Sequence, residues 1–250
     1  MLGYFYGYFE YLIWMLPAII LAGVAQFMVN NAYNKNAKIL NSKGITGAEA
    51  ARRVLSANGV SGVGIATTAG KLSDHFDPRT NTIYLSDGVY GKATVSAVGI
   101  AAHEAGHAVQ HAEGYLPNKV RAVLVPVTKI GSTLGWLLIV LGFAFSGFNY
   151  YYNNVVSTNS FAYKMGGLMV VLGIILYSTS LLFTLVTLPV EFNASKRALK
   201  AIEATSMLEG KEYSGAKSVL SAAAMTYVAA AFTALLQLLR IVMIFNRRRN

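Results

Sequence analysis

The chain has 250 residues, of which 54% are hydrophobic and only 13% are charged, and this composition excludes an ordinary soluble domain in favour of membrane insertion. The formal charge of +10 does not indicate a nucleic-acid partner, because the basic residues are scattered between apolar stretches and the one dense run, NRRRN, directly follows such a stretch. Membrane lipids are the better partner for these charges. Cysteine is absent, which excludes disulfides and thiolate metal ligands.

Four apolar stretches are each long enough to cross a hydrocarbon core, which takes about 20 helical residues. They cover residues 11–28, 130–148, 166–190 and 220–245. We interpret the first as a retained membrane anchor rather than a signal peptide, because residues 1–10 contain no Lys or Arg. The fourth contains Arg240, whose long side chain can reach a membrane interface.

The distribution of Lys and Arg predicts how the chain is oriented in the membrane. Residues 29–119 and 191–218 are rich in basic side chains, whereas the loop 149–165 has only Lys164. The two basic segments are therefore predicted to be cytoplasmic and the loop external. A fourth span would place the triple-arginine tail outside, against the same tendency, and the sequence leaves open whether the last helix crosses fully.

These features predict a mainly α membrane protein with about four transmembrane helices and a small cytoplasmic α+β unit, located as a multi-pass protein in the cell membrane. The α+β unit carries a helix with the pattern His-Glu-x-x-His. Along the chain, the predicted parts are an N-terminal anchor, the α+β unit, a transmembrane hairpin, a cytoplasmic helical segment, and a C-terminal membrane helix with its basic tail, over residues 1–30, 31–119, 120–190, 191–219 and 220–250.

Residues 44–112 show the local signals of the α+β unit. Thr46 and Glu49 form a capping box at the start of a helix that Gly59 ends. The stretches 63–68 and 81–86, VGIATT and NTIYLS, read as strands separated by a turn region around Pro78. A further helix is predicted from about residue 94 to 112, with Gly114 as its stop.

The second of these helices carries AAHEAGHAVQH, residues 101–111. His103 and His107 are four residues apart and project from one helix face, so that both imidazoles can reach a single zinc ion. Glu104 is placed to act as a general base. The alternative is a set of polar residues on a buried helix without chemistry, although an unpartnered glutamate in such an apolar run would be costly.

The sequence leaves the third metal ligand open. His111 lies on the same face but about 6 Å farther along the axis, since a helix rises about 1.5 Å per residue, so it is more simply a neighbouring or surface residue. Glu191, where the third apolar stretch ends, is the leading candidate. It could equally be a glutamate at the start of an interfacial helix after Pro189, favoured there by the helix dipole.

Three motifs together resemble the YugP-like neutral zinc metallopeptidases of bacteria, and more distantly the HtpX-type and CAAX-prenyl membrane proteases. The motifs are LSDHFDPRTNTIYLSDGVY, AAHEAGHAVQH and TLPVEFNASKRAL, in this order. The resemblance implies a membrane metalloendopeptidase that binds zinc through His103, His107 and Glu191 and uses Glu104 as catalytic base. Together with the predicted orientation, it leads us to expect hydrolysis of peptide or membrane-protein substrates at the cytoplasmic face.

The chain departs from the wider pattern at one position. An aspartate is expected four residues after the glutamate ligand, where it orients a histidine, but this position is Ser195. Asn193 or Ser195 could supply a weaker substitute. Proteases of this broad type bind extended substrate along a sheet edge, for which NTIYLS is the candidate, although it could equally be an ordinary structural strand. His75 could stabilise the oxyanion or serve only in the turn.

Two other functions compete with this interpretation. A catalytically silent membrane scaffold or chaperone would keep zinc as a structural clamp with four protein ligands, for which His111 and His75 are the spare candidates. A site-2-type intramembrane protease would need an aspartate ligand from a later apolar helix, and none of the four stretches contains an aspartate.

Overall fold

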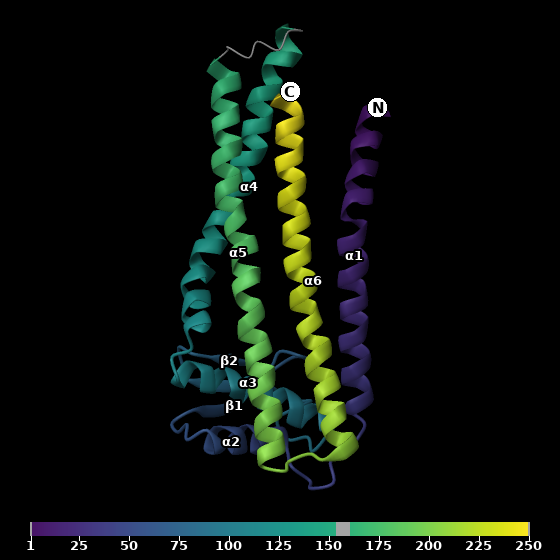
Figure 1. Cartoon of the computed structure of the whole chain (residues 1–250), viewed down its shortest axis with the longest axis vertical. Helices are drawn as coiled ribbons and strands as arrows, with labels where there is room; N and C mark the ends of the chain where they lie inside the picture. The colour runs from purple at the N-terminus through teal and green to yellow at the C-terminus, as the bar shows by residue number, and fades with distance from the viewer. Residues whose placement is uncertain (1, 154–160, 250) are drawn as a thin grey trace. The chain divides into compact units, whose positions relative to one another are not determined.

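The structure, a computed structural model, describes residues 2–153 and 161–249. Helices dominate this part of the chain, and one small sheet interrupts them (Figure 1). In chain order the elements are α1 (Leu2–Asn36), α2 (Gly47–Ala57), β1 (Gly64–Thr68), β2 (His75–Asp77), β3 (Thr82–Ser86), α3 (Val95–Ala112), α4 (Leu116–Asn153), α5 (Phe161–Ala204) and α6 (Gly210–Arg249).

Four of the described helices are long and apolar enough to cross a membrane, which confirms the predicted fold class. Their candidate spans are Glu10–Asn36, Leu116–Ser146, Phe161–Ala204 and Gly210–Arg247. Large apolar side chains stand exposed along them, including Phe27 at 70% and Ile175 at 59% of their full accessible area. Such surfaces suit contact with lipid rather than water. Residues 154–160, in the middle of the loop predicted to be external, lie outside the described residues.

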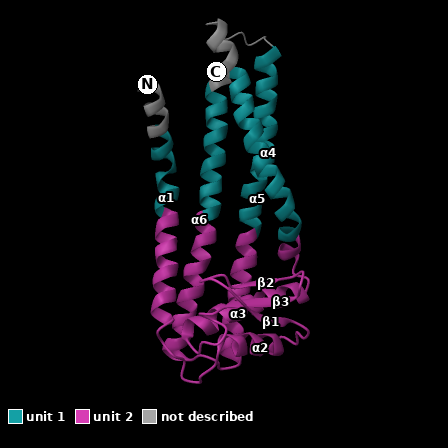
Figure 2. Cartoon of the chain, turned by 180° about the vertical axis from the view of Figure 1, so that it is seen from behind, with its two compact units in different colours: residues 1–20, 120–186, 230–250 teal, residues 21–119, 187–229 magenta. Residues whose placement is uncertain are grey.

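The chain divides into two compact units (Figure 2). The first comprises residues 1–20, 120–186 and 230–250, and the second comprises residues 21–119 and 187–229. The five parts expected from the sequence follow the order of the chain rather than these contacts, and that division stays a prediction.

In the first unit, α4 and α5 approach each other through glycines. A Cβ atom added to Gly135 would lie 2.8 Å from the carbonyl oxygen of Gly173, and one added to Gly142 would lie 2.6 Å from that of Gly166. The two backbones can come this close only because these positions lack side chains, which is a common way for membrane helices to pack. In the stretch GGLMVVLG, residues 166–173, Gly166 and Gly173 therefore serve packing within the chain, whereas a Cβ atom added to Gly167 would meet nothing within 4 Å.

The second unit contains the sheet, whose strand order is β1-β3-β2. β1 pairs with β3 in parallel, and β2 pairs with β3 in antiparallel orientation. The expectation that residues 81–86 form a sheet edge is therefore wrong, because β3 has a neighbour on each side. The predicted turn region also contains a strand, β2. The sequence analysis did not predict it, because turn-forming residues flank its three positions.

Helix α3 lies at the centre of the core of the second unit. Its inward positions are small, and Ala97, Ala101, Ala105 and Ala108 are each at most 1% exposed. Thr94 caps its N-terminus by accepting a hydrogen bond from the backbone N–H of Ala97. Small side chains allow the neighbouring segments to pack closely around it, so the buried polar side chains of α3, unlike the exposed His111, are held away from bulk water.

Helix α5 is continuous across Pro189. It runs over Phe161–Ala204, and Glu191 lies within it rather than at the start of a new helix. The alternative interpretation of Glu191 as a helix-start residue is therefore wrong. Glu191 is also only 2% exposed, which a residue at a solvated helix start would not be.

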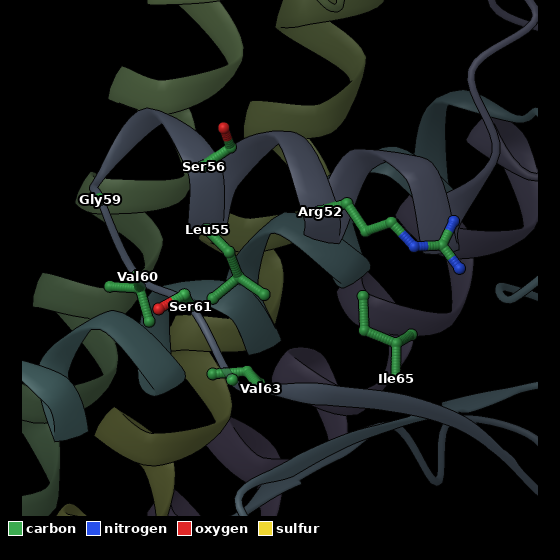
Figure 3. A pocket seen from close by; sticks show the side chains of 9 residues that line it. Arg52, Leu55, Ser56, Gly59, Val60, Ser61, Val63 and Ile65 are labelled. Carbon is green, nitrogen blue, oxygen red and sulfur yellow. The ribbon is translucent and has the colours of Figure 1, made fainter.

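A surface cavity of about 520 Å³ lies between α2 and the approach to β1 (Figure 3). Arg52, Leu55 and Ser56 come from α2, Val63 from the connection, and Ile65 from β1. Gly59, with a φ of +66°, occupies the left-handed conformation that ends the helix and opens this connection. None of the predicted site residues lines this cavity.

Candidate metal centre

Residues 103–107 lie in the middle of α3, where one helical face presents the motif side chains. The rings of His103 and His107 stand edge to face with centroids 4.7 Å apart. Both side chains are 14% exposed, so they are sheltered but reachable from one side. Glu104, next to His103, is 8% exposed. The four-residue spacing thus produces the convergence of imidazoles that it predicts.

Glu191 of α5 completes the cluster. Its Oε2 atom lies 3.3 Å from Nε2 of His103 and 3.4 Å from Nε2 of His107. One ligand atom from each of the three residues lies within 4.8 Å of the other two. A tetrahedral zinc site with bonds of about 2.1 Å holds its ligand atoms about 3.4 Å apart. The donor set and its spacing therefore fit a zinc ion.

Gly106 is the reason that α5 can approach α3 at this point. A Cβ atom added to Gly106 would lie 2.7 Å from the carbonyl oxygen of Ala194 and 3.4 Å from its Cα atom. Ala194 is one turn after Glu191 on α5, and it is fully buried. Glycine at the second unspecified position of the His-Glu-x-x-His pattern therefore lets α5 approach α3 closely enough for the carboxylate of Glu191 to reach the two histidines.

Ser195 occupies the position where the wider pattern has an aspartate. Its Oγ atom lies 3.1 Å from Nδ1 of His103, the ring nitrogen that faces away from Glu191. A hydroxyl can accept a hydrogen bond from this nitrogen, although without the negative charge of a carboxylate. The structure thus places Ser195 beside His103, where the sequence led us to expect a weaker substitute for the aspartate.

Gln110 contacts the other histidine and was not identified from the sequence. It is fully buried. Its Oε1 atom lies 3.1 Å from Nδ1 of His107, and its Nε2 atom lies 2.8 Å from the carbonyl oxygen of Val190 and 2.9 Å from Oδ1 of Asn193. The available sequence signal was a glutamine three residues after His107, on the inward face of an otherwise apolar helix.

Asn193 links Gln110 to an ion pair outside the cluster. Its Oδ1 atom accepts a hydrogen bond of 2.7 Å from Nε of Arg197. Nη1 of Arg197 also donates a hydrogen bond of 2.8 Å to Oε1 of Glu113, which follows the last residue of α3, and Nη2 forms an ion pair of 2.7 Å with Oε2. Hydrogen bonding to Arg197 lowers the pKa of Glu113. This bidentate ion pair links the C-terminal end of α3 to α5.

The surroundings of His107 alter its pKa. Burial alone would lower this pKa, but the hydrogen bond to Glu191 and the negative charges of Glu104 and Glu191 outweigh burial and raise it above the usual value of 6.5. A proton and a bound metal ion would therefore compete for the Nε2 atom of His107.

The structure does not bring His111 or His75 into this cluster. His111 is exposed, and its ring lies 5.7 Å from that of Phe76 on β2. His75 stacks on Tyr84 with ring centroids 5.1 Å apart. Because neighbouring side chains of a strand point to opposite faces, His75 lies on the face of the sheet opposite to Phe76 and hence away from α3. Roles for these two histidines stay predictions.

The chain belongs to the family described as "Putative neutral zinc metallopeptidase", whose model matches residues 11–246. It is 40% identical over 235 residues to "Putative membrane protease YugP" of Bacillus subtilis (strain 168), across 94% of this chain and 96% of that protein. No solved structure matches the chain significantly. Membership implies zinc as the metal, and the cluster of His103, His107 and Glu191 could hold it.

Proposed function

We propose that this protein is a gluzincin-type zinc endopeptidase of the cell membrane, with His103, His107 and Glu191 as metal ligands and Glu104 as catalytic base. The observation that carries the proposal is the pair of distances, 3.3 and 3.4 Å, from Oε2 of Glu191 to the two imidazole nitrogens. Among the residues that the structure describes, the cluster has three members. A structural zinc site is closed by four protein ligands, so three favour a catalytic site over a structural clamp.

A zinc ion, when bound, supplies Lewis acidity to the scissile carbonyl and to the attacking water. The residues of the chain supply the remainder of the chemistry. Glu104, as the base beside His103, takes a proton from the water and later delivers it to the leaving amine. Burial of the cluster under α5 limits bulk water at the reacting atoms, which strengthens each charge interaction there.

The substrate is proposed to bind along β2, the sheet edge beside α3. The backbone N–H of Gly64 donates to the carbonyl of Asn81, so in the parallel register odd-numbered residues of β3 direct their backbone groups to β1. Even-numbered residues then face β2, where His75 and Asp77 lie opposite Tyr84 and Thr82.

Phe76 lies between these paired residues, so its N–H and C=O point to the open edge. An extended peptide could add to the sheet there by backbone hydrogen bonds, which recognise main chain rather than sequence. The contact between Phe76 and His111 supports β2 as the edge next to the motif helix.

Membrane lipid is proposed as the second partner. Glu10, Trp14, Arg240 and Arg247 line one cavity of about 270 Å³ in the first unit, together with apolar side chains. The guanidinium of Arg240 lies 4.3 Å from the centroid of the Tyr11 ring. Two guanidinium groups beside apolar residues suit a lipid phosphate with its chains.

The cytoplasmic location of the site is proposed from the basic residues of its flanking segments. Because the chain has no cysteine, a single Ser61→Cys variant can report the side. We expect a membrane-impermeant maleimide to label this variant in inverted vesicles and not in intact cells. Labelling in intact cells would reverse the assigned orientation.

The decisive experiment on the proposed function compares Glu104→Gln and Glu191→Ala in purified full-length protein. Glu104→Gln should retain zinc and lose peptide hydrolysis by roughly 100-fold to 10,000-fold, the usual contribution of a general base. Glu191→Ala should lose zinc. Hydrolysis at the wild-type rate by Glu104→Gln, or an unchanged zinc stoichiometry in Glu191→Ala, would refute the corresponding role.

A further inference from the structure

The hydrogen-bond partners of Asn193 establish which of its side-chain atoms is oxygen. Amide oxygen and nitrogen have to be assigned from their neighbours. Nε of Arg197 is a donor under all conditions, and it lies 2.7 Å from one atom of this amide. That atom must therefore be the acceptor, Oδ1.

The same reasoning fixes the orientation of the buried Gln110 amide. One of its two polar atoms lies 2.9 Å from Oδ1 of Asn193 and 2.8 Å from the carbonyl oxygen of Val190. Both neighbours are acceptors, and only an NH₂ group has two protons to satisfy them. Nε2 therefore points to α5. The remaining atom, Oε1, is an acceptor that faces Nδ1 of His107 at 3.1 Å.

When Nε2 of His107 binds a metal ion, the proton of the neutral ring lies on Nδ1, and Oε1 of Gln110 is the acceptor that faces it. In the metal-free protein Nε2 also faces an acceptor, Oε2 of Glu191 at 3.4 Å, so Gln110 alone does not fix the tautomer there. We propose that Gln110 is a positioning residue that accepts the Nδ1–H of His107 and thereby orients Nε2 of this ring toward a bound zinc ion. This inference rests on the proposed function.

Gln110 restrains the imidazole nitrogen that it faces more firmly than Ser195 does. A serine hydroxyl can donate or accept, so Ser195 alone does not select a tautomer of His103. Gln110 cannot turn its amide over without placing its oxygen against two acceptors and its NH₂ group against Nδ1. Burial strengthens this preference, because no water could satisfy the misplaced groups. The restraint on His107 is therefore transmitted from α5.

The tautomer is measured directly on the wild-type full-length protein with zinc bound. With ¹⁵N-labelled histidine in detergent micelles, each imidazole nitrogen reports by its chemical shift whether it carries a proton. Single substitutions of the four histidines assign the signals. With zinc bound, we expect the proton of His107 on Nδ1 and the metal on Nε2. A proton on Nε2 would overturn the proposal, and this result does not depend on any Gln110 variant being folded.

Zinc affinity provides the second readout, by competition with a chelator. Gln110→Met keeps the length of the side chain but removes the acceptor, and should weaken zinc binding by roughly 10-fold to 100-fold. Gln110→Glu keeps an oxygen for Nδ1–H and should recover part of this loss. Ser96→Ala, a buried polar truncation elsewhere on α3, is the matched control and should leave zinc affinity unchanged.

The outcomes separate this inference from the proposed function. If the wild type binds zinc and a folded Gln110→Met variant binds it equally tightly, the role of Gln110 is refuted while the peptidase proposal stands. If the wild type binds no zinc, the peptidase proposal and the role of Gln110 fail together.

Discussion

Oγ of Ser195 lies 3.1 Å from Nδ1 of His103, so a neutral hydroxyl from α5 contacts a proposed metal ligand on α3. Gln110 supports His107 in a comparable way, also without charge. A carboxylate in these positions would make the imidazoles more basic ligands. With neutral partners the imidazoles donate less electron density, and a bound zinc ion should remain the stronger Lewis acid.

Substitution of Ser195 tests this relationship. Ser195→Ala removes the acceptor for His103 and should lower zinc affinity by about 10-fold, the lower end of the usual effect of such a partner. Ser195→Asp should raise it, because a charged acceptor forms the stronger hydrogen bond. Isothermal titration or chelator competition measures both. Ser214→Ala, an exposed serine of α6, is the control. Equal affinities in Ser195→Ala and wild type would remove Ser195 from the site.

Gly106→Ala should push α5 away from α3. The new Cβ would meet the backbone of Ala194 at 2.7 Å, and overpacking of this kind costs about 1–3 kcal/mol. Alanine is by itself the better helix former by about 1 kcal/mol, so helix propensity alone would predict a gain in stability, opposite to the loss expected here. Thermal unfolding and zinc titration should show loss of stability and of affinity together. In Gly23→Ala the added Cβ meets nothing within 4 Å, and it should be neutral or stabilising.

The raised pKa of His107 predicts opposite pH dependences with and without zinc. A histidine whose pKa is raised in the folded state stabilises the metal-free protein at low pH, and this stability is lost as the pH rises through the folded pKa, above 6.5. Zinc requires the unprotonated ring, so its affinity rises over the same range. The difference in Tm between zinc-loaded and metal-free protein should therefore grow above pH 6.5. A difference that stays flat there, or that is unchanged in His107→Gln, would contradict this account.

Proline at position 76 tests the substrate edge. Because the N–H of Phe76 points away from β3, Phe76→Pro should leave the sheet paired while removing a donor for an added peptide strand. Phe76→Leu changes the side chain but keeps the N–H. With a labelled unfolded protein as substrate, Phe76→Pro should reduce kcat/KM well below Phe76→Leu, with zinc content unchanged in both. Equal kcat/KM for the two variants would place the substrate elsewhere.

The motif residues were predictable because their relationship is local. His103 and His107 converge through the geometry of one helix, and a sequence spacing of four is sufficient to specify it. Glu191 could not be assigned from its own neighbourhood, because its meaning depends on α5 continuing through Pro189 and on packing at Gly106. Gln110 remained hidden because its partners, Val190 and Asn193, lie 80 and 83 residues away in the chain.

The order of the strands likewise could not be predicted from local sequence patterns. β2 has only three residues, too few for alternation to be recognised, and it is positioned in part by a tertiary contact. The carboxylate of Asp74 accepts hydrogen bonds from the backbone N–H and the hydroxyl of Ser86, which holds the approach to β2 against the end of β3. Strand propensity identified β3 correctly but contained no information on its two neighbours.

The approach of Ala194 to Gly106 also has a consequence for engineering. His-Glu-x-x-His leaves two positions unspecified, and a combinatorial library would normally randomise them first. Here Ala105 is fully buried and Gly106 faces the backbone of α5, so most members of such a library would lose the fold before they gained a new specificity. The β2 edge, which meets the proposed substrate without holding the two helices together, is the better place to introduce diversity.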